Sequence, residues 1–183
     1  ATHVPYRSWC RHCVRVRWRN APHRRQAGEE AEVKESKVPR ISMDYHFMSK
    51  EDDEAQDNPI LTVVDERTGA CFAMAAGHKG MGEAGDRAWL AKSVVEELDA
   101  WGYRGEDLII RTEQERAIMS MQKAIAALRT GKTIPQMSAV GESASNGRIE
   151  EAGKRIREYA KTFLDQLEYS IGVELKDVEV VSH

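Results

Sequence analysis

The hydrophobic and polar positions after residue 40 follow two different periods. Short segments that are apolar or alternating predict strands, and longer segments with apolar residues at three- and four-residue intervals predict helices. The predicted strands cover residues 40–48, 60–65, 70–77, 107–112 and 133–140, and the predicted helices cover residues 83–101, 114–129 and 148–169. Segment 65–69 is typical of a hairpin turn, in which Gly69 is able to take a positive φ.

These elements follow one another in the order β-β-β-α-β-α-β-α. Three strands joined by short loops indicate an antiparallel meander, and the later alternation adds strands and helices in turn. The predicted fold class is therefore α/β, with a five-stranded mixed sheet flanked by helices, in the order seen in ribonuclease H-like folds. Pro135 favours an edge position for the fifth strand, because proline donates no backbone hydrogen bond.

The chain is expected to divide into four segments. Residues 40–170 hold the predicted core, residues 14–39 lack apolar periodicity and indicate a linker, and residues 171–183 form a tail that is either one more strand or frayed. Residues 1–13 carry a separate cysteine motif. Within the core, residues 50–59 and 141–147 are expected to form loops. The buried stripe of the last helix is expected to comprise Ile149, Ala152, Ile156, Ala160, Phe163 and Leu167.

Composition and charge narrow the function. With 41% hydrophobic and 31% charged residues, the chain is neither membrane-spanning nor wholly disordered. Residues 1–28 contain seven Arg, Arg15, Arg17 and Arg19 among them, and no acidic residue, whereas the rest of the chain holds 20 basic and 30 acidic residues. A basic arm on an acidic domain favours a nucleic-acid partner, since arginine pairs with phosphates. The alternative is a solvated linker without a specific partner.

Two of the three cysteines form a possible metal motif. Cys10 and Cys13 have the C-x2-C spacing that lets both thiolates reach one metal ion, and His3 and His12 are nearby nitrogen donors. Only half of a zinc site is visible, so a reduced cysteine pair in a flexible arm is an equal alternative. Cys71 is expected to be a small core residue. A reducing intracellular compartment follows from this cysteine usage.

Three carboxylates fall at positions that suit metal-dependent chemistry. Asp44 lies inside the first strand, Glu113 directly follows the fourth strand, and Glu150 lies in the first turn of the last helix. Such a set on rigid elements can hold two divalent ions for displacement at phosphorus. Taken singly, Glu113 is better explained as a cap of the next helix and Glu150 as a first-turn acid favoured by the helix dipole, but together, in this strand order, they favour a metal site. Glu115 is expected to point elsewhere if its segment stays extended.

The ordered set of motifs resembles the integrase catalytic core of retroviruses and long-terminal-repeat retrotransposons, closest to the Copia type. The segments that carry the resemblance span residues 2–165: THVPYRSWCRHC, RISMDYHF, ILTVVDERTG, LIIRTEQE and SNGRIEEAGKRIRE. The resemblance implies DNA end-processing and strand transfer with two Mg²⁺ or Mn²⁺ ions, double-stranded DNA as partner, a homo-oligomer, no membrane association and action on chromosomal DNA in the nucleus.

The resemblance also assigns individual residues. Asp44, Glu113 and Glu150 match the metal-ligand triad, and Lys154 and Arg157 match the helix face that contacts the element's DNA end. Cys10, Cys13 and His3 match three zinc ligands. The fourth ligand, a histidine, would lie upstream of Ala1, so a truncated zinc module is expected.

One position departs from the family. The family has Asp at the second catalytic position, where this chain has Glu113. The extra methylene moves the carboxylate by about 1 Å, which is enough to lower a rate by about 10²-fold. Two alternatives therefore stay open: a catalytically lapsed integrase-like domain that binds DNA or protein, and a ribonuclease H-type nuclease, which would need one more carboxylate.

Overall fold

All the predicted strands and helices are present, together with two short helices that the sequence pattern did not predict. The computed structural model describes residues 3, 7–17, 37–55, 58–81, 88–138 and 143–174. The strands are β1 Arg40–His46, β2 Ile60–Asp65, β3 Cys71–Ala75, β4 Leu108–Thr112 and β5 Thr133–Met137. The helices are α1 Arg11–Arg17, α3 Lys50–Ala55, α4 Ala88–Leu98 with a π-helical turn Asp99–Tyr103, α5 Arg116–Leu128 and α6 Ser143–Ile171.

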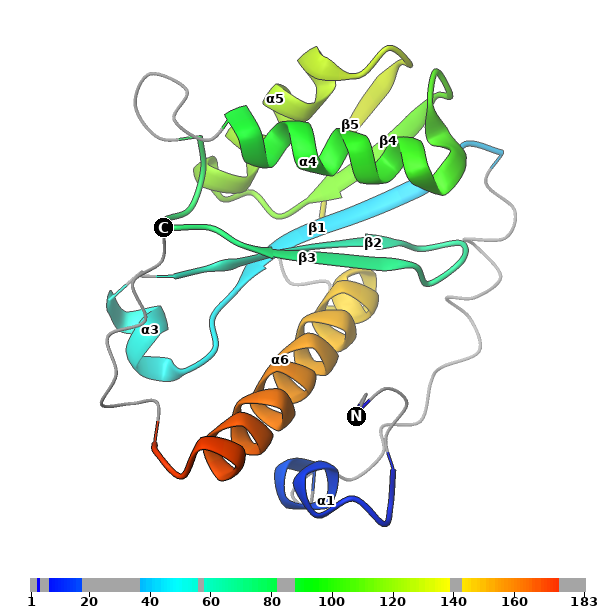
Figure 1. Cartoon of the computed structure of the whole chain (residues 1–183). Coiled ribbons are helices and arrows are strands. Elements are labelled where there is room, and N and C mark those ends of the chain that lie inside the picture. Colours follow the sequence, from blue (N-terminus) through cyan, green and yellow to red (C-terminus); the bar gives the residue numbers. More distant parts are fainter. Residues whose placement is uncertain are drawn as a thin grey trace. The chain divides into compact units, whose positions relative to one another are not determined.

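The strands form one mixed sheet in the order β3-β2-β1-β4-β5 (Figure 1). β1 pairs antiparallel with β2 and parallel with β4, while β2–β3 is antiparallel and β4–β5 is parallel. The order and directions confirm the predicted α/β fold of ribonuclease H-like type. β5 lies at an edge, as Pro135 predicted, and Asp44 lies on the central strand.

The chain divides into two compact units, each described here by itself. The sheet unit comprises Arg25–Gly153, and the terminal unit comprises Ala1–Arg24 together with Lys154–His183. α6 therefore contributes its first part to the sheet unit and its remainder to the terminal unit. The four-segment division made from the sequence stays a prediction. No helix among the described residues is long and apolar enough to cross a membrane.

The two faces of the sheet bury different sets of side chains. Ile41, Met43 and Tyr45 of β1 point into the main core under α4 and α5, together with Leu108 and Ile110 of β4. The opposite face packs Val64 against Ile149 and Ala152 of α6 in a smaller cluster, which half-buried Cys71 adjoins. Because side chains alternate along a strand, Ser42, Asp44 and His46 belong to this second face. The main core thus leaves the polar residues of β1 on the α6 side.

The hairpin between β2 and β3 has the predicted turn. Gly69 has a φ of 77°, and its backbone N–H donates to the Asp65 carbonyl at 2.8 Å. The buried carboxylate of Asp65 also accepts from the Thr68 hydroxyl at 2.5 Å and from the Tyr103 hydroxyl at 2.8 Å. Burial and the bond to Asp65 raise the pKa of Tyr103 to about 12. These bonds fix the turn and link it to the end of α4.

Two segments that were predicted to be loops are partly helical. Residues 50–55 form α3 instead of a loop, because Ser49 and Asp52 cap it reciprocally: the Asp52 N–H donates to Ser49 Oγ at 3.0 Å, and the Ser49 N–H donates to Asp52 Oδ2 at 3.1 Å. Residues 143–147 are helical instead of forming a loop, since a single glycine costs a helix only about 1 kcal/mol. Residues 14–17 belong to α1, and the rest of the predicted linker up to residue 36 lies outside the described residues.

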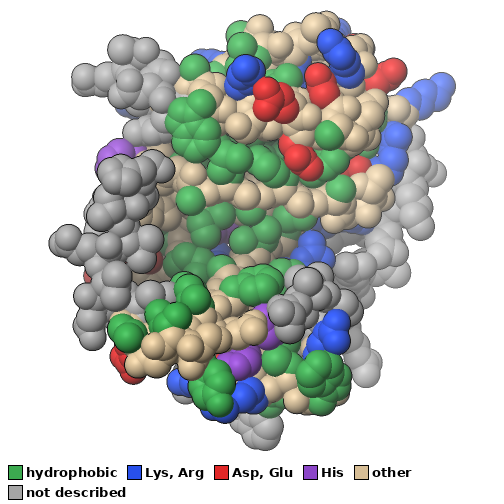
Figure 2. Space-filling view, viewed as in Figure 1, with side chains coloured by type: hydrophobic (Ala, Val, Ile, Leu, Met, Phe, Trp, Pro, Cys, Tyr) green, Lys and Arg blue, Asp and Glu red, His purple; other side chains and the backbone are tan. Residues whose placement is uncertain are grey.

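The predicted stripe of α6 holds only over its first part. Ile149 and Ala152 are buried, whereas Phe163 and Leu167 are 45% and 47% exposed in the terminal unit. Further large apolar side chains of this unit, including Trp9 and Tyr169, are also exposed, and Figure 2 shows hydrophobic side chains at its surface. The predicted tail lies outside the described residues from position 175 onward.

Candidate functional site

Asp44 and Glu113 lie at neighbouring strand ends. β1 and β4 are adjacent and parallel, and their register aligns Ile41 with Ile110 and Ser42 with Arg111. Continued by two residues, this register brings Asp44 level with Glu113. Ligands of α/β sheets bind at the carboxyl ends of parallel strands, which is where both residues lie. The sheet therefore brings together two of the three carboxylates that the sequence singled out.

The surroundings of Asp44 disfavour its negative charge. Burial, followed by the negative charge of Glu113, raises the pKa of Asp44 to about 7. Glu115 adds to the rise, while the N–H of Tyr45, which donates to Asp44 Oδ1 at 2.8 Å, and the charge of Lys79 oppose it. A buried carboxylate beside other negative charges is stabilised when it binds a proton or a cation. This feature points to chemistry at Asp44.

Glu115 lies near enough to Asp44 for its charge to raise the pKa of Asp44. The backbone at Glu115 is extended, with φ −77° and ψ 133°, and yet its charge acts on Asp44. Lys79 Nζ contacts both carboxylate oxygens of Glu115 at 3.2 Å and lies 5.1 Å from the centre of the Phe47 ring. Lys79, from the loop after β3, therefore pairs with Glu115, which together with Asp44 and Glu113 is called the carboxylate group below.

The loop that carries Lys79 is fastened on both sides. The N–H of Ala76 donates to the Pro59 carbonyl at 2.8 Å, and the N–H of Gly80 donates to the Tyr45 hydroxyl at 3.1 Å. Gly80 has a φ of +76° and packs against Ala117 of α5, where a Cβ would meet the Ala117 Cα at 3.3 Å. Sequence reasoning missed Lys79, because a single lysine after a strand carries no recognisable signal.

Thr62 is a second residue that the sequence did not reveal. It pairs directly with Asp44 across the antiparallel β1–β2 ladder, so both side chains lie on the same face of the sheet. Thr62 is 0% exposed, and its hydroxyl has no hydrogen-bond partner among the described residues. A buried hydroxyl without a partner is costly, and this one adjoins the candidate carboxylates.

The first part of α6 is fixed closely on the sheet. A Cβ on Gly153 would clash with the His46 imidazole ring, so glycine lets α6 lie against this side chain of β1 in its present position. Arg148 donates from its guanidinium to the Glu66 carbonyl oxygen. Glu150 lies between these two contacts and is exposed. It is not among the charged groups that act most strongly on the pKa of Asp44. The contribution of Glu150 to the carboxylate group therefore stays a prediction.

Buried Glu66 orders the same face of the sheet. Its carboxylate accepts from Ser42 Oγ at 2.5 Å and lies 3.3 Å from Arg111 and 3.6 Å from Arg40. Glu66 is 3% exposed although it belongs to the hairpin turn, a position that usually favours exposure. The network connects β1, β4 and the turn, and with Arg148 it connects α6. It holds the strands that carry Asp44 and Glu113 in register.

Asp44 and Glu113 suit, by donor type, the divalent ion that the family resemblance implies, while among the described residues no third carboxylate converges with them into a metal-ligand group. Asp44 and Glu113 offer the oxygen ligands that Mg²⁺ and Mn²⁺ prefer. The pKa of Asp44 is raised chiefly by burial and then by the negative charge of Glu113. A cation held by Asp44 and Glu113 would relieve that repulsion.

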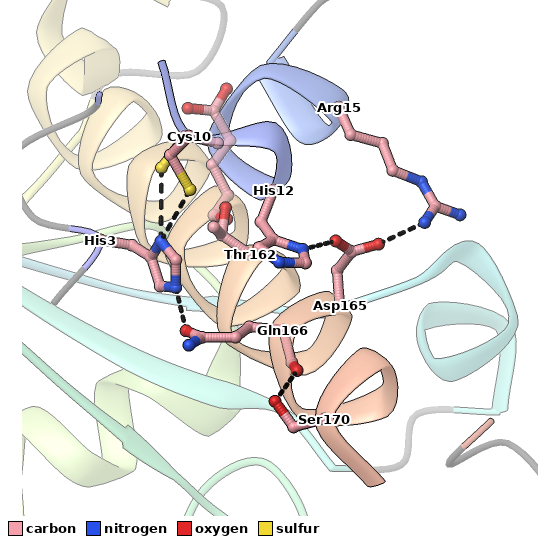
Figure 3. Close-up of polar contacts among 10 residues, drawn as sticks. His3, Cys10, His12, Arg15, Thr162, Asp165, Gln166 and Ser170 are labelled. Carbon is pink, nitrogen blue, oxygen red and sulfur yellow. Dashed lines mark hydrogen bonds and ion pairs between the residues drawn. The ribbon is translucent and has the colours of Figure 1, made fainter. Parts of the chain in front are cut away.

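A second donor group lies in the terminal unit. His3 Nδ1 is 3.5 Å from both the Cys10 and the Cys13 sulfur, and the three ligand atoms lie within 4.8 Å of one another (Figure 3). The backbone N–H of Cys13 is the main cause that lowers the pKa of the Cys10 thiol to about 7. Thiolate and imidazole donors of this kind suit Zn²⁺. The predicted partners therefore converge, while His12 binds Asp165 instead.

The predicted DNA-contacting residues have varied surroundings. Arg15 is exposed and pairs with Asp165 at 2.7 Å. Lys154 and Arg157 on α6 are half-buried. Arg17 lies in α1, but its side chain is outside the described residues, as is the whole of Arg19. The DNA-binding role of all five residues stays a prediction.

Comparisons with known proteins give limited information. No protein-family model matches the chain, and no curated protein matches it. Among solved structures, the chain is similar to a chain in the structure of the simian T-cell lymphotropic virus intasome in complex with the PP2A regulatory subunit B56 gamma, at 10% identity and a TM-score of 0.39 over 69% of this chain and 48% of the other. The chain thus spans about half the length of that intasome chain. It is also similar to the fowlpox virus Holliday junction resolvase, at 12% identity and a TM-score of 0.26 over 73% of this chain and 99% of the other. Likenesses at these TM-scores support no functional argument.

Proposed function

We propose that this chain is a retroelement integrase-like domain that processes DNA ends and transfers them into target DNA in a metal-dependent reaction. The observation that carries the proposal is the placement of Asp44 and Glu113 at the ends of adjacent parallel strands, where burial and mutual repulsion raise the pKa of Asp44 to about 7. Carboxylates that need positive charge at such a sheet edge suit catalysis at a phosphodiester.

The proposed reaction is an in-line displacement at phosphorus. Water in end-processing, or a DNA 3′-hydroxyl in strand transfer, forms the new P–O bond while the bond to a 3′-oxygen breaks and that oxygen takes up a proton. Mg²⁺ or Mn²⁺, when bound, supplies the positive charge that activates the nucleophile and stabilises the leaving oxygen. Asp44, Glu113 and Glu150 are proposed as the residues that would hold the divalent ions.

Basic residues of the chain are proposed to position the DNA. Lys154 and Arg157 would contact the element's end, and Arg15, Arg17 and Arg19 of the basic arm would pair with backbone phosphates. Zn²⁺ at His3, Cys10 and Cys13 would stabilise the N-terminal segment. Because two DNA ends are joined in one event, we also propose that the domain works as a homo-oligomer in the nucleus.

A specific observation favours a second candidate, a lapsed integrase-like domain that binds DNA or protein without catalysis. Glu113 is one methylene longer than the family's Asp, and Lys79 already supplies a positive charge to the carboxylate group through Glu115. The positive charge of Lys79 competes with a metal ion for the negative charge of these carboxylates. The two candidates differ only in chemistry, so an activity assay separates them.

The test uses a branched oligonucleotide that mimics the product of strand transfer. Transesterification is reversible, so the reverse reaction is measurable without knowledge of the element's end sequence. The full chain is expected to release the joined strand with Mn²⁺ more readily than with Mg²⁺, and Asp44→Asn is expected to abolish release. Glu113→Asp is expected to raise the Mg²⁺-dependent rate by about 10²-fold. Glu54→Gln, an exposed carboxylate on α3, serves as the matched control.

DNA binding is measured in parallel over a series of salt concentrations. Integrase activity requires that affinity fall steeply with salt and that Lys154→Glu with Arg157→Glu weaken binding. Salt-dependent binding without strand release by the wild type or Glu113→Asp would favour the lapsed domain. Strand release that survives Asp44→Asn would show that the carboxylate assignment is wrong.

A further inference from the structure

His3 is held from both sides of its imidazole ring. Its Nδ1 faces the sulfurs of Cys10 and Cys13 at 3.5 Å each, while its Nε2 contacts the side-chain oxygen of Gln166 on α6 (Figure 3). The ring is 3% exposed and stacks edge-on against Phe163, with ring centres 5.2 Å apart. The orientation of the ring is therefore set by α6 and not by the cysteines alone.

The donor and acceptor roles fix where the His3 proton lies. An amide oxygen only accepts, so the contact with Gln166 requires a hydrogen on Nε2. A neutral imidazole with hydrogen on Nε2 has its lone pair on Nδ1, which is the nitrogen that faces both sulfurs. In the metal-free protein this lone pair can accept from a cysteine S–H, and a metal ion would find it already aimed at the two sulfurs.

From this geometry we propose that Gln166 is a positioning residue that selects the metal-binding tautomer of His3 and thereby tightens Zn²⁺ binding at His3, Cys10 and Cys13. The proposal rests on the zinc site named under the proposed function. Outer-shell partners of metal-bound histidines typically contribute 10–100-fold to metal affinity, about the range expected for this contact. It places part of the zinc site's affinity on Gln166 of α6, a residue that is not itself a zinc ligand.

Other contacts keep the N-terminal segment on α6 when Gln166 is changed. His12 Nδ1 contacts Asp165 Oδ2, the other oxygen of Asp165 pairs with Arg15 at 2.7 Å, and the Arg11 guanidinium lies 4.4 Å from the centre of the Tyr169 ring. Substitution of Gln166 therefore removes the hydrogen-bond acceptor of His3 and leaves the contacts of Arg11, His12 and Arg15 with α6 in place. The effect of the His3 tautomer on Zn²⁺ binding can then be measured by itself.

The experiment uses the full chain and needs no catalytic activity. In the metal-free protein, the ¹⁵N chemical shifts of His3 report the tautomer directly: wild type is expected to show hydrogen on Nε2, and Gln166→Leu a mixture of both tautomers. Zn²⁺ affinity is then measured by competition with a chromophoric chelator. Gln166→Leu is expected to weaken binding by about 10–100-fold, whereas Gln166→Glu, which keeps an acceptor, is expected to bind as tightly as wild type or more tightly.

Lys161→Met, an exposed change on the same helix, is the matched control and is expected to leave affinity and shifts unchanged. Circular dichroism of the metal-free variants reports whether each one folds. If Gln166→Leu keeps the wild-type tautomer and affinity, or if Gln166→Glu is as weak as Gln166→Leu, the positioning role is wrong. A wild type that shows the Nε2–H tautomer but binds no Zn²⁺ refutes the zinc site and this role, while the DNA chemistry of the carboxylates is tested separately.

Discussion

Asp44→Asn is expected to stabilise the metal-free protein at neutral and alkaline pH. The pKa of Asp44 is raised from an ordinary 3.8 to about 7, chiefly by burial and then by the charge of Glu113. The folded state therefore binds this proton more tightly than the unfolded state does. For this group, the free energy of unfolding is highest below 3.8, falls as the pH rises from 3.8 to about 7, and is constant above that.

The size of the effect follows from the same values. The interval between 3.8 and about 7, at about 1.4 kcal/mol per pH unit, corresponds to about 4 kcal/mol as an upper limit. Asparagine has nearly the same shape and keeps an oxygen that can accept from the Tyr45 N–H, but it carries no charge. At about pH 8.5 the variant should therefore unfold at higher urea concentration than wild type, and at about pH 4 the difference should nearly vanish.

The assay is urea unfolding followed by circular dichroism, in buffer with a chelator, across this pH range. Glu54→Gln, the exposed control on α3, should show no comparable pH-dependent gain. Added Mg²⁺ or Mn²⁺ should stabilise wild type by about 2.7 kcal/mol at a hundred times its dissociation constant, and should leave Asp44→Asn almost unchanged. Equal stabilities of wild type and Asp44→Asn at about pH 8.5 would refute the electrostatic account of this site.

Three further substitutions examine the surroundings of the site. Gly153→Ala should cost about 1–3 kcal/mol, since its Cβ would lie 2.2 Å from His46, and the cost should largely disappear in a His46→Ala background; a double-mutant cycle measures this coupling. Lys79→Met should raise the pKa of Asp44 further, because Lys79 now lowers it, and the midpoint of the pH-dependent stability change should move to higher pH. Thr62→Val should raise the free energy of unfolding by about 1 kcal/mol in urea titrations, because it removes a buried hydroxyl without a partner among the described residues; a loss of stability would show that the hydroxyl is bonded.

The sheet could be predicted because its signals are local. Apolar alternation in residues 40–48 and 60–65 and the turn at Gly69 identify β1, β2 and the hairpin without knowledge of tertiary contacts. Pro135 likewise predicts the edge position of β5, because proline has no backbone N–H to donate to a neighbouring strand. The errors lie where a local pattern is ambiguous: α3 begins with a reciprocal cap that resembles an ordinary polar loop, and α6 continues through Gly147.

The candidate site could be predicted only in part. Asp44 and Glu113 follow from their strands, because adjacent parallel strands bring their carboxyl ends together. Lys79 and Thr62 reach the site through a loop and a cross-strand pairing, and these positions have no distinctive residue pattern. The helix contacts of His3 were equally hidden, since Gln166 is 163 positions away in the sequence. Long-range partners of this kind require the tertiary structure.

Three positive partners can offset the charge of Asp44: a proton, Lys79 and a divalent cation. They differ in how strongly they interact with the carboxylate. A proton binds with a pKa of about 7, so near neutral pH it occupies the carboxylate only about half of the time. Lys79 contacts Glu115 at 3.2 Å and ranks behind burial and Glu113 among the influences on Asp44, so it offsets only part of their effect. A divalent cation carries twice the charge of Lys79 and can contact the carboxylates of Asp44 and Glu113 directly. Under the proposed function we therefore expect a divalent cation to compete with both the proton and Lys79 at neutral pH, and the lapsed-domain hypothesis requires that the longer Glu113 side chain prevent productive metal binding.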